Sequence, residues 1–521
     1  MNDMENSFKI TYRFTEPKKK DMRLIFFIIF SCEIALGIYF SYFKDIVLND
    51  ALSRTANSFY VLFVKPRRFA SIGLVWNPLP SVLQLPLVYL AKFWRPMVSS
   101  GIAANIITAL FSALSCSYIY KIFIRLKVPK VYSIILIALY VTNPFIFFYG
   151  SNGMSEVIFF FMIIYSVLCL TLWIKEGSAN YIVKIAFALA MAFFCRYEAV
   201  PFALAIGVGV VLIIFFSKKE KKFVFNNSFK EKYFYAESSL VILYTPFLYS
   251  IMLWILFNWI ISGNALYFLN SAYSNSAQSQ YAATITNSIS ALKYILKKCE
   301  PFMPLFIGIV IIRIKNKRLL RIDFLILLFM VMIMIIFHFT MLIKGNSYGW
   351  FRFFSYSLPI CFAWIPYELS EINKKHKKFE FSVLIVSLLL SSILTGTALL
   401  DASLSPEEHN LIITNESHKV ADYINSDLSD EIILSDSFLT SGILVNVQNV
   451  DNLVISSSLN FKEAVKNPWK YGVTYILVPD KSGIGKLDAI NTQYPDLYKY
   501  GAEWCTLVKE FDGYKLFKVN Y

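Results

Sequence analysis

Long apolar runs, separated by short polar segments, make up most of the first 400 residues of the chain. Because about 20 apolar residues in a helix cross the hydrocarbon core of a bilayer, each run predicts a membrane-spanning helix. The expected spans lie near residues 23–43, 100–122, 130–149, 155–174, 181–195, 199–217, 238–262, 301–314, 322–343, 353–367 and 380–400. The pattern therefore predicts a mainly α, polytopic membrane protein with about 11 transmembrane helices.

Lys and Arg residues are distributed unevenly between the two sets of loops that these spans define. With the N-terminal arm, residues 1–22, placed in the cytoplasm, that arm, Arg23 and the loops on the same side hold 27 Lys and Arg residues, against 13 on the opposite side. Cytoplasmic loops carry such an excess. The distribution predicts a multi-pass plasma-membrane protein with a cytoplasmic N-terminus and, after an odd number of spans, an extracytoplasmic C-terminus.

Composition supports this class of protein and excludes another. The chain has 521 residues, of which 57% are hydrophobic and only 16% charged, whereas soluble chains carry about 25% charged residues. The net charge of +15 is compatible with nucleic-acid binding, but residues 401–521 hold 17 acidic and 10 basic residues. The positive excess thus sits in short loops between apolar runs, and no nucleic-acid partner is expected.

The pattern changes in the last segment, residues 401–521, which alternates short apolar runs with helical periodicity. EIILSD and YILVPD predict buried strands, HKVADYINSDL and GKLDAINTQYPDLYKYG predict helices, and CTLVKEFDGYKLFKV predicts a hairpin turned at Asp512-Gly513. About 120 residues suffice for an independent core. We therefore expect three parts: a cytoplasmic arm (1–22), a transmembrane domain (23–400) and a small external α/β domain (401–521).

The first external loop, residues 45–98, contains two segments that favour helices at the membrane surface. Apolar positions recur at helical spacing over residues 51–64, which predicts an amphipathic interfacial helix. Residues 76–94 are apolar but interrupted by three prolines, and therefore suit a loop with an interfacial or re-entrant helix. Glu33 lies within the first span, where a carboxyl group indicates function or an interhelical hydrogen bond; the latter or a groove-facing role is preferred.

Several external loops would bring polar or ionisable side chains to one face of the membrane. Carboxylates can transfer protons, and arginine or lysine can bind a phosphate group, so these side chains predict an interfacial active site. The candidates are Asp50, Arg54, Trp76, Asn152, Glu156, Arg196, Glu198, Lys344, Tyr348 and Arg352.

Several of these candidates also have a purely structural explanation. Asp50 is a possible N-cap of the helix over residues 51–64, with Arg54 as its surface partner one turn later. Glu156 and Glu198 can serve as helix N-terminal charges, and Glu198 can simply pair with Arg196. Lys344, at the end of a span, can extend along apolar surface toward the membrane interface.

No cofactor is expected from the sequence. The seven cysteines and four histidines lack metal-ligand spacing. The glycines in GVG and GIGKL fit neither a dinucleotide fingerprint nor a phosphate-binding loop.

Six strings, taken in order, resemble the GT-C superfamily of integral-membrane glycosyltransferases. The nearest branch is that of the protein O-mannosyltransferases and the aminoarabinose lipid A transferases. The strings are NDALSRTANSFYVL, VWNPLPSVLQLPLV, YGSNGMSEVIFFF, FFCRYEAVPFALA, SGNALYFLNSAYSN and GWFRFFSYSLPI. The resemblance covers roughly residues 22–400.

The resemblance implies transfer of a single sugar from a polyprenyl-phosphate donor to a glycan, lipid or protein acceptor at the outer face. Asp50 matches the acidic residue that acts as general base in the first external loop. Arg352 matches the arginine near the donor phosphate, with Lys344, Arg196 and Arg54 as weaker candidates for that role. Substrate contacts would come from Glu156, Asn152, Glu198, Trp76 and Tyr348.

One departure from the family pattern concerns metal binding. The protein mannosyltransferases typically show two adjacent acids in this loop, whereas Asn49 precedes Asp50 here. Metal independence is therefore expected. Two other functions stay open at this point: a transporter or flippase of lipid-linked sugars, and a non-enzymatic polymer-binding or assembly protein that works through its C-terminal domain.

Overall fold

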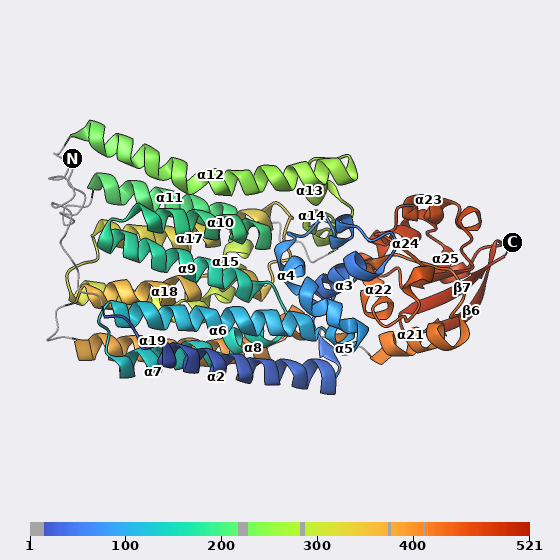
Figure 1. Cartoon of the computed structure of the whole chain (residues 1–521), viewed down its shortest axis with the longest axis horizontal. Helices are drawn as coiled ribbons and strands as arrows, with labels where there is room; N and C mark the ends of the chain where they lie inside the picture. The colour runs from blue at the N-terminus through green and yellow to red at the C-terminus, as the bar shows by residue number, and fades with distance from the viewer. Residues whose placement is uncertain are drawn as a thin grey trace.

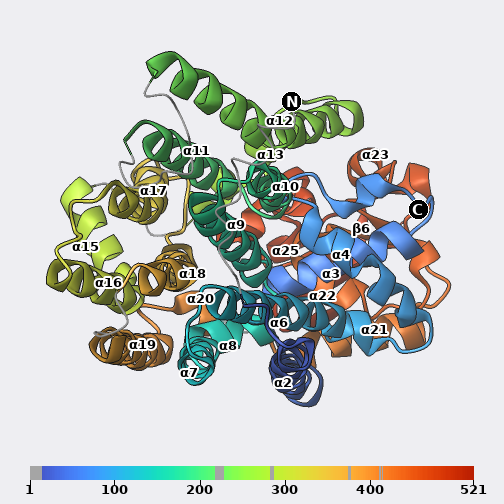
Figure 2. The ribbon, with the colours of Figure 1, turned by 60° about the vertical axis from the view of Figure 1, so that its left-hand side comes forward.

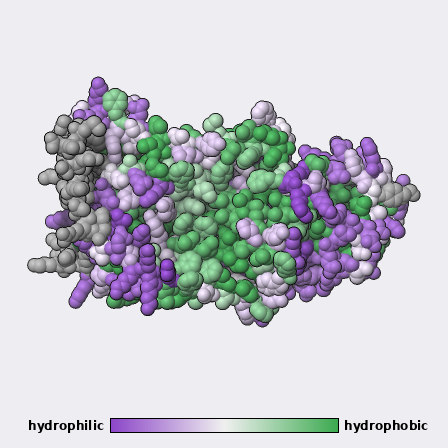
Figure 3. All heavy atoms as spheres, viewed as in Figure 1, coloured by the Kyte–Doolittle hydropathy of each residue, from purple (hydrophilic) through white to green (hydrophobic). Residues whose placement is uncertain are grey.

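The structure, a computed structural model, describes residues 15–216, 228–281, 287–372, 377–409, 412–413 and 415–520. A bundle of long helices forms one part of the molecule, and an α/β domain lies at one end of it (Figure 1). On the face in view, Figure 3 shows a hydrophobic belt across the middle of the bundle, between a hydrophilic far end and the hydrophilic α/β domain. This distribution is the one expected for a protein that spans a membrane with the belt.

Helices occupy all of the places where the apolar runs predict spans. They are α2 (Lys19–Ile38) with the π-helical turn η1 (Tyr39–Phe43), α6 (Ile102–Arg125), α7 (Lys130–Val141), α8 (Pro144–Ser151), α9 (Glu156–Glu176), α10 (Ala179–Cys195), α11 (Ala199–Phe216), α12 (Phe229–Ser262), α16 (Pro304–Lys315), α17 (Ile322–Ile343), α18 (Ser357–Ser370) and α19 (Lys377–Leu400). The predicted polytopic, mainly α architecture is thereby confirmed.

Among the described residues, seven helices are long and apolar enough to cross a membrane alone. Helices α7 and α8 meet at 70° and together make an eighth candidate. Pro144 opens α8, and the Asn143 side chain accepts from the backbone N–H of Phe145, which fixes the bend. Helix α10 has 17 residues, α16 has 12 and α18 has 14, so these three are shorter than the length a straight span needs.

The arrangement of the bundle follows from which helices are apolar on every side. Helix α9 is the most thoroughly buried candidate span, and it lies in the middle of the bundle, whereas α2, α12 and α19 lie at the periphery (Figure 2). Glu33 of α2 is fully buried and accepts a hydrogen bond from the Ser112 hydroxyl of α6 at 2.7 Å. This is the interhelical hydrogen bond preferred for Glu33 on sequence grounds.

The long loop after α2 folds into short elements between the bundle and the α/β domain. They are β1 (Ile46–Val47), α3 (Asn49–Phe63), η2 (Phe69–Ile72), α4 (Leu79–Val88), η3 (Tyr89–Lys92) and α5 (Pro96–Ser99). The residues after α4 suit an interfacial helix, since Tyr89, Leu90, Phe93 and Trp94 are exposed.

Helix α3 is covered by protein on two sides, and not by lipid as the amphipathic pattern suggested. It packs against α4 on one side and against α22 (Ser437–Leu444) of the α/β domain on the other. The apolar residues of its apolar face are buried, and so are Arg54, Thr55 and Ser58. The amphipathic pattern is therefore explained by burial between two protein layers, which periodicity alone does not distinguish from burial in lipid.

The C-terminal α/β domain contains a five-stranded sheet with the order β4-β3-β5-β7-β6. Its strands are β3 (Ile433–Ser435), β4 (Leu453–Ile455), β5 (Tyr475–Pro479), β6 (Cys505–Phe511) and β7 (Tyr514–Val519), and its helices include α21 (Asn415–Asp427), α22, α23 (Phe461–Lys466), α24 (Ala489–Gln493) and α25 (Leu497–Tyr500). The predicted hairpin is confirmed as β6–β7. The single helix predicted over GKLDAINTQYPDLYKYG is wrong: η9 (Gly483–Leu487), α24 and α25 replace it, with Asp488 capping α24 and Pro495 preceding α25.

Several contacts fix the α/β domain to the bundle. Strand β2 (Ile412–Ile413) pairs with β1, directly before α3. Arg95 donates to the backbone oxygens of Val445 at 2.6 Å and Val447 at 2.7 Å. The linker between α19 and the domain therefore passes the start of α3, where Asp50 lies.

Candidate active site

Six charged side chains form a cluster of ion pairs at the end of the bundle that faces the α/β domain. We call this the domain-side cluster; it consists of Asp50, Glu156, Arg196, Glu198, Arg352 and Glu407. Five of the six side chains come from loops that the sequence predicts on one face of the membrane. The structure thus brings together most of the ionisable groups selected from the sequence.

Arg352 lies at the centre of the cluster. It belongs to η5 (Phe351–Phe354), directly before α18, and is 5% exposed. Its Nη2 lies 2.8 Å from Asp50 Oδ2 and 2.9 Å from Glu407 Oε1, and its Nη1 lies 3.3 Å from Glu156 Oε1. One guanidinium group therefore holds three carboxyl groups from three separate segments.

Arg196 forms the second centre, in the turn between α10 and α11. It pairs with Glu156 and donates to Glu198 Oε1 from Nη2 at 2.7 Å. Glu198 also accepts from the Tyr356 hydroxyl at 3.0 Å, and His338 Nε2 lies 3.9 Å away. Burial would raise the pKa of Glu198, but Arg196 and His338 outweigh it and lower that pKa to about 2. Glu156, bound to both arginines, links the two centres.

Three helices begin at this cluster, and each places a carboxyl group there. Asp50 lies in the first turn of α3, Glu156 is the first residue of α9, and Glu198 directly precedes α11. Backbone N–H groups at helix N-termini carry partial positive charge and favour anions. The same geometry that stabilises these carboxylates would favour a phosphate group at the cluster.

Asp50 does not act as the helix cap that local sequence allowed. Leu48 holds the N-cap position of α3, and no side-chain capping bond forms there. The Asp50 side chain is 29% exposed and turns to Arg352. Partial burial would raise the pKa of Asp50, but the charges of Arg352, Arg54 and Arg196 hold the pKa below its usual value. Asp50 is therefore an ionised carboxylate at the edge of the cluster.

Arg54 and Trp76 form a separate layer beside the cluster. The Arg54 guanidinium lies over the Trp76 ring, 4.8 Å from its centroid, and donates to the backbone oxygen of Asn77 at 3.5 Å. Arg54 is buried, not the exposed partner of Asp50 that helical spacing allowed. It acts on Asp50 by charge, since it lowers the pKa of that carboxyl.

The remaining candidates lie at different depths. The Asn152 side-chain oxygen accepts from the Met154 N–H at 3.1 Å, while its Nδ2 is buried with no hydrogen-bond partner among the described residues. Tyr348 stacks on Trp350 with ring centroids 4.9 Å apart, and burial and the charge of Asp50 raise its pKa. Lys344 is exposed at the end of α17 and stands outside the cluster.

Sequence reasoning missed Glu407 because it lies after the last span, in a segment assigned to the α/β domain. Glu407 belongs to α20 (Pro406–His409), and its neighbour Glu408 accepts from the Tyr149 hydroxyl at 2.6 Å. Lys298 of α15 (Ser288–Cys299) was also missed; it is buried, donates to the Gly349 oxygen at 2.8 Å, and has a pKa lowered by burial to about 8. Two adjacent acids directly after a span were a signal for Glu407.

The domain-side cluster leaves buried polar atoms without a hydrogen-bond partner among the described residues. They are Arg352 Nε, Glu156 Oε2 and Glu407 Oε2. Buried polar groups are normally paired, so these three atoms indicate a site that can take up a polar ligand. Within the described residues no group of three or more His, Cys, Asp or Glu side chains is arranged to hold a metal ion.

A second set of buried ion pairs lies at the opposite end of the bundle. We call it the far-side cluster; it consists of Lys175, Arg313, Arg318, Arg321, Asp323, Glu368 and Glu371. Arg313 Nη2 lies 2.9 Å from Asp323 Oδ2, and its Nε donates to Glu368 Oε1 at 2.7 Å. These contacts join α16, α17 and α18 where the helices turn.

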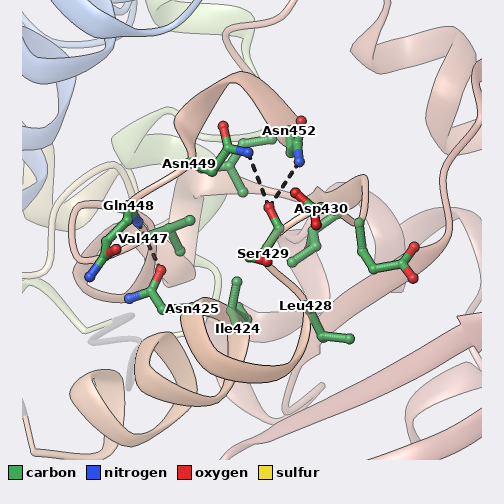
Figure 4. A pocket seen from close by; sticks show the side chains of 12 residues that line it. Ile424, Asn425, Leu428, Ser429, Asp430, Val447, Gln448, Asn449 and Asn452 are labelled. Atoms are coloured by element: carbon green, nitrogen blue, oxygen red, sulfur yellow. Dashed lines mark hydrogen bonds between the residues drawn. The ribbon is translucent and has the colours of Figure 1, made fainter.

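A small cavity of about 120 Å³ lies within the α/β domain (Figure 4). It is lined by the end of α21 and the starts of β3 and β4. Asn449 and Asn452 both donate to the Ser429 oxygen, at 3.0 and 3.1 Å, so these amides are already paired. Its lining residues include none of the domain-side cluster, although Arg95 donates to the oxygen of Val447, one of the lining residues. The cavity is therefore separate from that cluster.

Comparisons with known proteins found a similar fold but no match by sequence. No family model matches the chain, and no curated protein matches its sequence. The crystal structure of ArnT from Cupriavidus metallidurans bound to undecaprenyl phosphate matches with a TM-score of 0.56, covering 94% of this chain and 97% of ArnT at 9% sequence identity. The chain therefore has a fold like that of ArnT, and the polytopic membrane fold expected from the sequence is confirmed.

Proposed function

We propose that this protein is a glycosyltransferase that moves one sugar from a polyprenyl-phosphate donor to an acceptor, with the domain-side cluster as its active site. The observation that carries the proposal is the contact between Asp50 and Arg352 in a chain with the fold of ArnT, whose crystal structure holds undecaprenyl phosphate. The cluster combines a carboxylate for proton transfer with arginines for a phosphate. Both are needed for this reaction.

In the proposed reaction Asp50 takes the proton from the acceptor hydroxyl or amine. The acceptor atom forms a bond to the anomeric carbon of the sugar, and the bond from that carbon to the phosphate oxygen breaks. The electron pair leaves with the phosphate, whose charge Arg352 stabilises. Arg196 and Arg54 add positive charge near the same point, whereas the role suggested for Lys344 rests on the sequence alone.

Binding of the donor would also make Asp50 a better base. In the donor-free site Arg352 lowers the pKa of Asp50, and a base with a low pKa accepts a proton poorly. A phosphate group that takes hydrogen bonds from Arg352 weakens this hold and adds negative charge nearby, which raises the proton affinity of Asp50. The donor therefore helps to activate the base that the reaction uses.

The other candidate residues surround this centre. We propose that Glu156 and Asn152 bind sugar hydroxyls or the acceptor, because each has a buried polar atom without a partner in the described structure. Three further side chains would shape the site: Glu198, Trp76 and Tyr348. Glu198 holds Arg196 by an ion pair, and the Trp76 ring lies against the Arg54 guanidinium. Neither a cofactor nor a metal is required in this scheme.

The proposed placement in the membrane follows the distribution of basic residues. We propose that residues 1–22 are cytoplasmic, that residues 23–400 form the transmembrane domain, and that residues 401–521 form an extracytoplasmic domain of a plasma-membrane protein. The hydrophobic belt of Figure 3 lies on one side of the α/β domain, and Asp50 of the domain-side cluster belongs to α3, which packs against that domain. Donor and acceptor would meet at the outer membrane surface.

A transporter or flippase of lipid-linked sugars is the second candidate function. Buried Glu33, within the first span, is the observation that favours it. However, Glu33 is held by Ser112, as expected of a structural group. An assay for movement of the lipid across vesicles distinguishes this function from transfer.

The experiment uses purified protein and its Asp50→Asn variant with a panel of polyprenyl-phosphate sugars and candidate acceptors, followed by release of polyprenyl phosphate. Asp45→Asn is the matched control, because Asp45 lies nearby in the chain with an exposed side chain, 3.7 Å from His418. We expect release from one donor, preserved in Asp45→Asn and lost in Asp50→Asn while donor binding is retained. Release that survives in Asp50→Asn would assign the base to another residue, and lipid movement without release would favour the transporter.

A further inference from the structure

Two carboxyl groups share one nitrogen atom of Arg352. Asp50 Oδ2 and Glu407 Oε1 lie 2.8 and 2.9 Å from Nη2. If all four carboxyl groups of the domain-side cluster were ionised, its two arginines would not balance them. The nearby Arg54 and Lys298 add two positive charges, but the adjacent Glu408 adds a fifth carboxyl group. An uncompensated buried charge is costly, and carboxyl groups that share a site tend to keep a proton between them.

The structure favours Glu407 as the group that keeps this proton. Asp50 is the more exposed of the two, at 29% against 16%, and lies at the N-terminus of the 15-residue helix α3, which stabilises a negative charge. Glu407 sits in α20, a single turn of helix. Burial and the neighbouring charge of Asp50 raise the pKa of Glu407 well above its usual value, although Arg352 opposes this.

The second carboxyl oxygen of Glu407 makes no hydrogen bond within the described residues. This atom, Oε2, is buried. A protonated carboxyl group carries a donor O–H, and leaving a buried donor without an acceptor costs free energy. Arg352 Nε is a second buried donor in the same state. Two unsatisfied donors on contacting side chains fit a ligand that brings acceptor oxygens.

We propose that Glu407 is part of the donor site and works there as a neutral carboxylic acid. Its Oε1 accepts the hydrogen bond from Arg352, and its Oε2–H donates to a phosphate oxygen of the lipid donor. This assignment rests on the proposed function, because it takes the polyprenyl phosphate as the ligand. No covalent bond changes at Glu407; the residue binds the phosphate without adding a negative charge beside it.

The proposal makes donor binding depend on pH, so all charged neighbours of Glu407 matter. Lys298, whose pKa is lowered to about 8, also titrates in the neutral to alkaline range and would weaken phosphate binding as it loses its charge. A comparison between variants at each pH removes this shared effect. The charged or titratable groups around Glu407 are Asp50, Tyr149, Glu156, Lys298, Arg352 and Glu408.

The experiment measures the affinity of the purified full-length protein for undecaprenyl phosphate from neutral to alkaline pH. Glu407→Gln keeps an acceptor and a donor at the same places but does not ionise, whereas Glu407→Met keeps the size of the side chain and has neither. Glu408→Gln is the matched control, since Glu408 is the adjacent acid and contacts Tyr149 instead of Arg352.

We expect Glu407→Gln to bind as tightly as the wild type at neutral pH, and Glu407→Met to bind about tenfold more weakly. At alkaline pH the wild type and Glu408→Gln should lose affinity more steeply than Glu407→Gln. If Glu407 were an ionised counter-ion, Glu407→Gln would bind more tightly than the wild type at neutral pH, which would overturn the proposal. Equal affinity of Glu407→Met and wild type, or equal pH dependence of wild type and Glu407→Gln, would overturn it as well.

Failure of the proposed function gives a different result. A wild-type protein that does not bind undecaprenyl phosphate at any pH contradicts the donor class itself, and the assignment of Glu407 falls with it. Binding by the wild type with no effect at Glu407 contradicts only the assignment of Glu407. A variant that does not fold is recognised by its thermal unfolding, and Glu407→Gln, the closest in shape, then decides the question by its pH dependence.

Discussion

The two ionic clusters use the same residue types at opposite ends of the bundle, but they differ in charge balance. In the far-side cluster four basic side chains face three carboxyl groups, whereas in the domain-side cluster two arginines hold four carboxyl groups. The far-side pair Arg313 and Glu368 is fully buried, while Asp50 at the domain side is partly exposed. A closed cluster in which every carboxyl group has a basic partner suits the joining of helices. An acid-rich, partly open one suits the exchange of protons and the binding of an additional group.

The clusters also differ in what they connect. The far-side cluster joins helices that follow each other closely along the chain, mainly α16, α17 and α18. The domain-side cluster brings together the first external loop, the starts of α9 and α11, η5 and the linker after α19. Groups gathered from so many separate segments favour a site for transfer chemistry over a simple contact between helices.

The largest effect is expected from Arg352→Lys. A lysine carries the charge but cannot hold Asp50, Glu156 and Glu407 with the geometry of a guanidinium. Loss of one group that stabilises developing charge typically lowers kcat by about 100-fold or more. Release of polyprenyl phosphate at saturating donor measures this effect. Arg313→Lys, the equivalent change in the far-side cluster, should leave kcat of the folded protein near the wild-type value; an equal loss in both variants would remove the distinction between the clusters.

Glu368→Gln is expected to affect stability but not catalysis. Removal of one partner from a buried ion pair destabilises proteins by about 3–5 kcal/mol, because Arg313 would lose its main carboxylate partner. Thermal unfolding of the detergent-purified protein should therefore shift to lower temperature. The kcat per folded molecule should stay unchanged, and a selective loss of kcat without loss of stability would contradict a structural role for the far-side cluster.

A smaller effect on stability is expected from Tyr149→Phe. This variant tests whether the hydrogen bond beside the domain-side cluster is structural and not catalytic. The Tyr149 hydroxyl donates to Glu408 at 2.6 Å, and removing a hydrogen bond to a buried charged group costs about 1.5–3 kcal/mol. We expect a lower unfolding temperature with kcat within about twofold of wild type, since neither residue touches Arg352. A large fall in kcat would extend the active site to this pair.

The smallest effect concerns pH. Because the pKa of Asp50 is lowered in the donor-free protein, Asp50 stays ionised as the pH falls, down to below the usual aspartate value of about 3.9. The kcat/KM should therefore show no acidic loss attributable to Asp50 between about pH 5 and pH 7. Asp50→Asn should be lower at every pH with the same shape of profile. A wild-type acidic limb in this interval that disappears in Asp50→Asn would show that Arg352 does not control Asp50.

The sequence predicted the bundle well because hydrophobic length is a direct physical requirement of the bilayer. It also selected Asp50, Glu156, Arg196, Glu198 and Arg352, since charged groups at span ends are conspicuous against an apolar background. It did not find the true neighbours of α3, because an apolar face looks the same whether lipid or protein covers it. The broken helix in the α/β domain was missed because Pro495 was read as part of one continuous pattern.

Glu407 shows the limit of reading the chain by segments. It follows the last span by a few residues and was assigned to the α/β domain, where acids are common. The pairing of β2 with β1 brings this linker beside the start of α3 and Arg352. Such a long-range pairing of two-residue strands leaves no periodic signal in the sequence.

The central claim is that the donor phosphate binds at the domain-side cluster. The most direct measurement uses polyprenyl phosphate with a photoreactive group on the isoprene unit next to the phosphate, cross-linked to the purified protein and located by mass spectrometry. We predict labelling of peptides around Asp50, Glu156 and Arg352, competed by unlabelled undecaprenyl phosphate and reduced in Arg352→Lys. Competed labelling confined to the ends of α16 and α18, beside Arg313 and Glu368, would contradict the account.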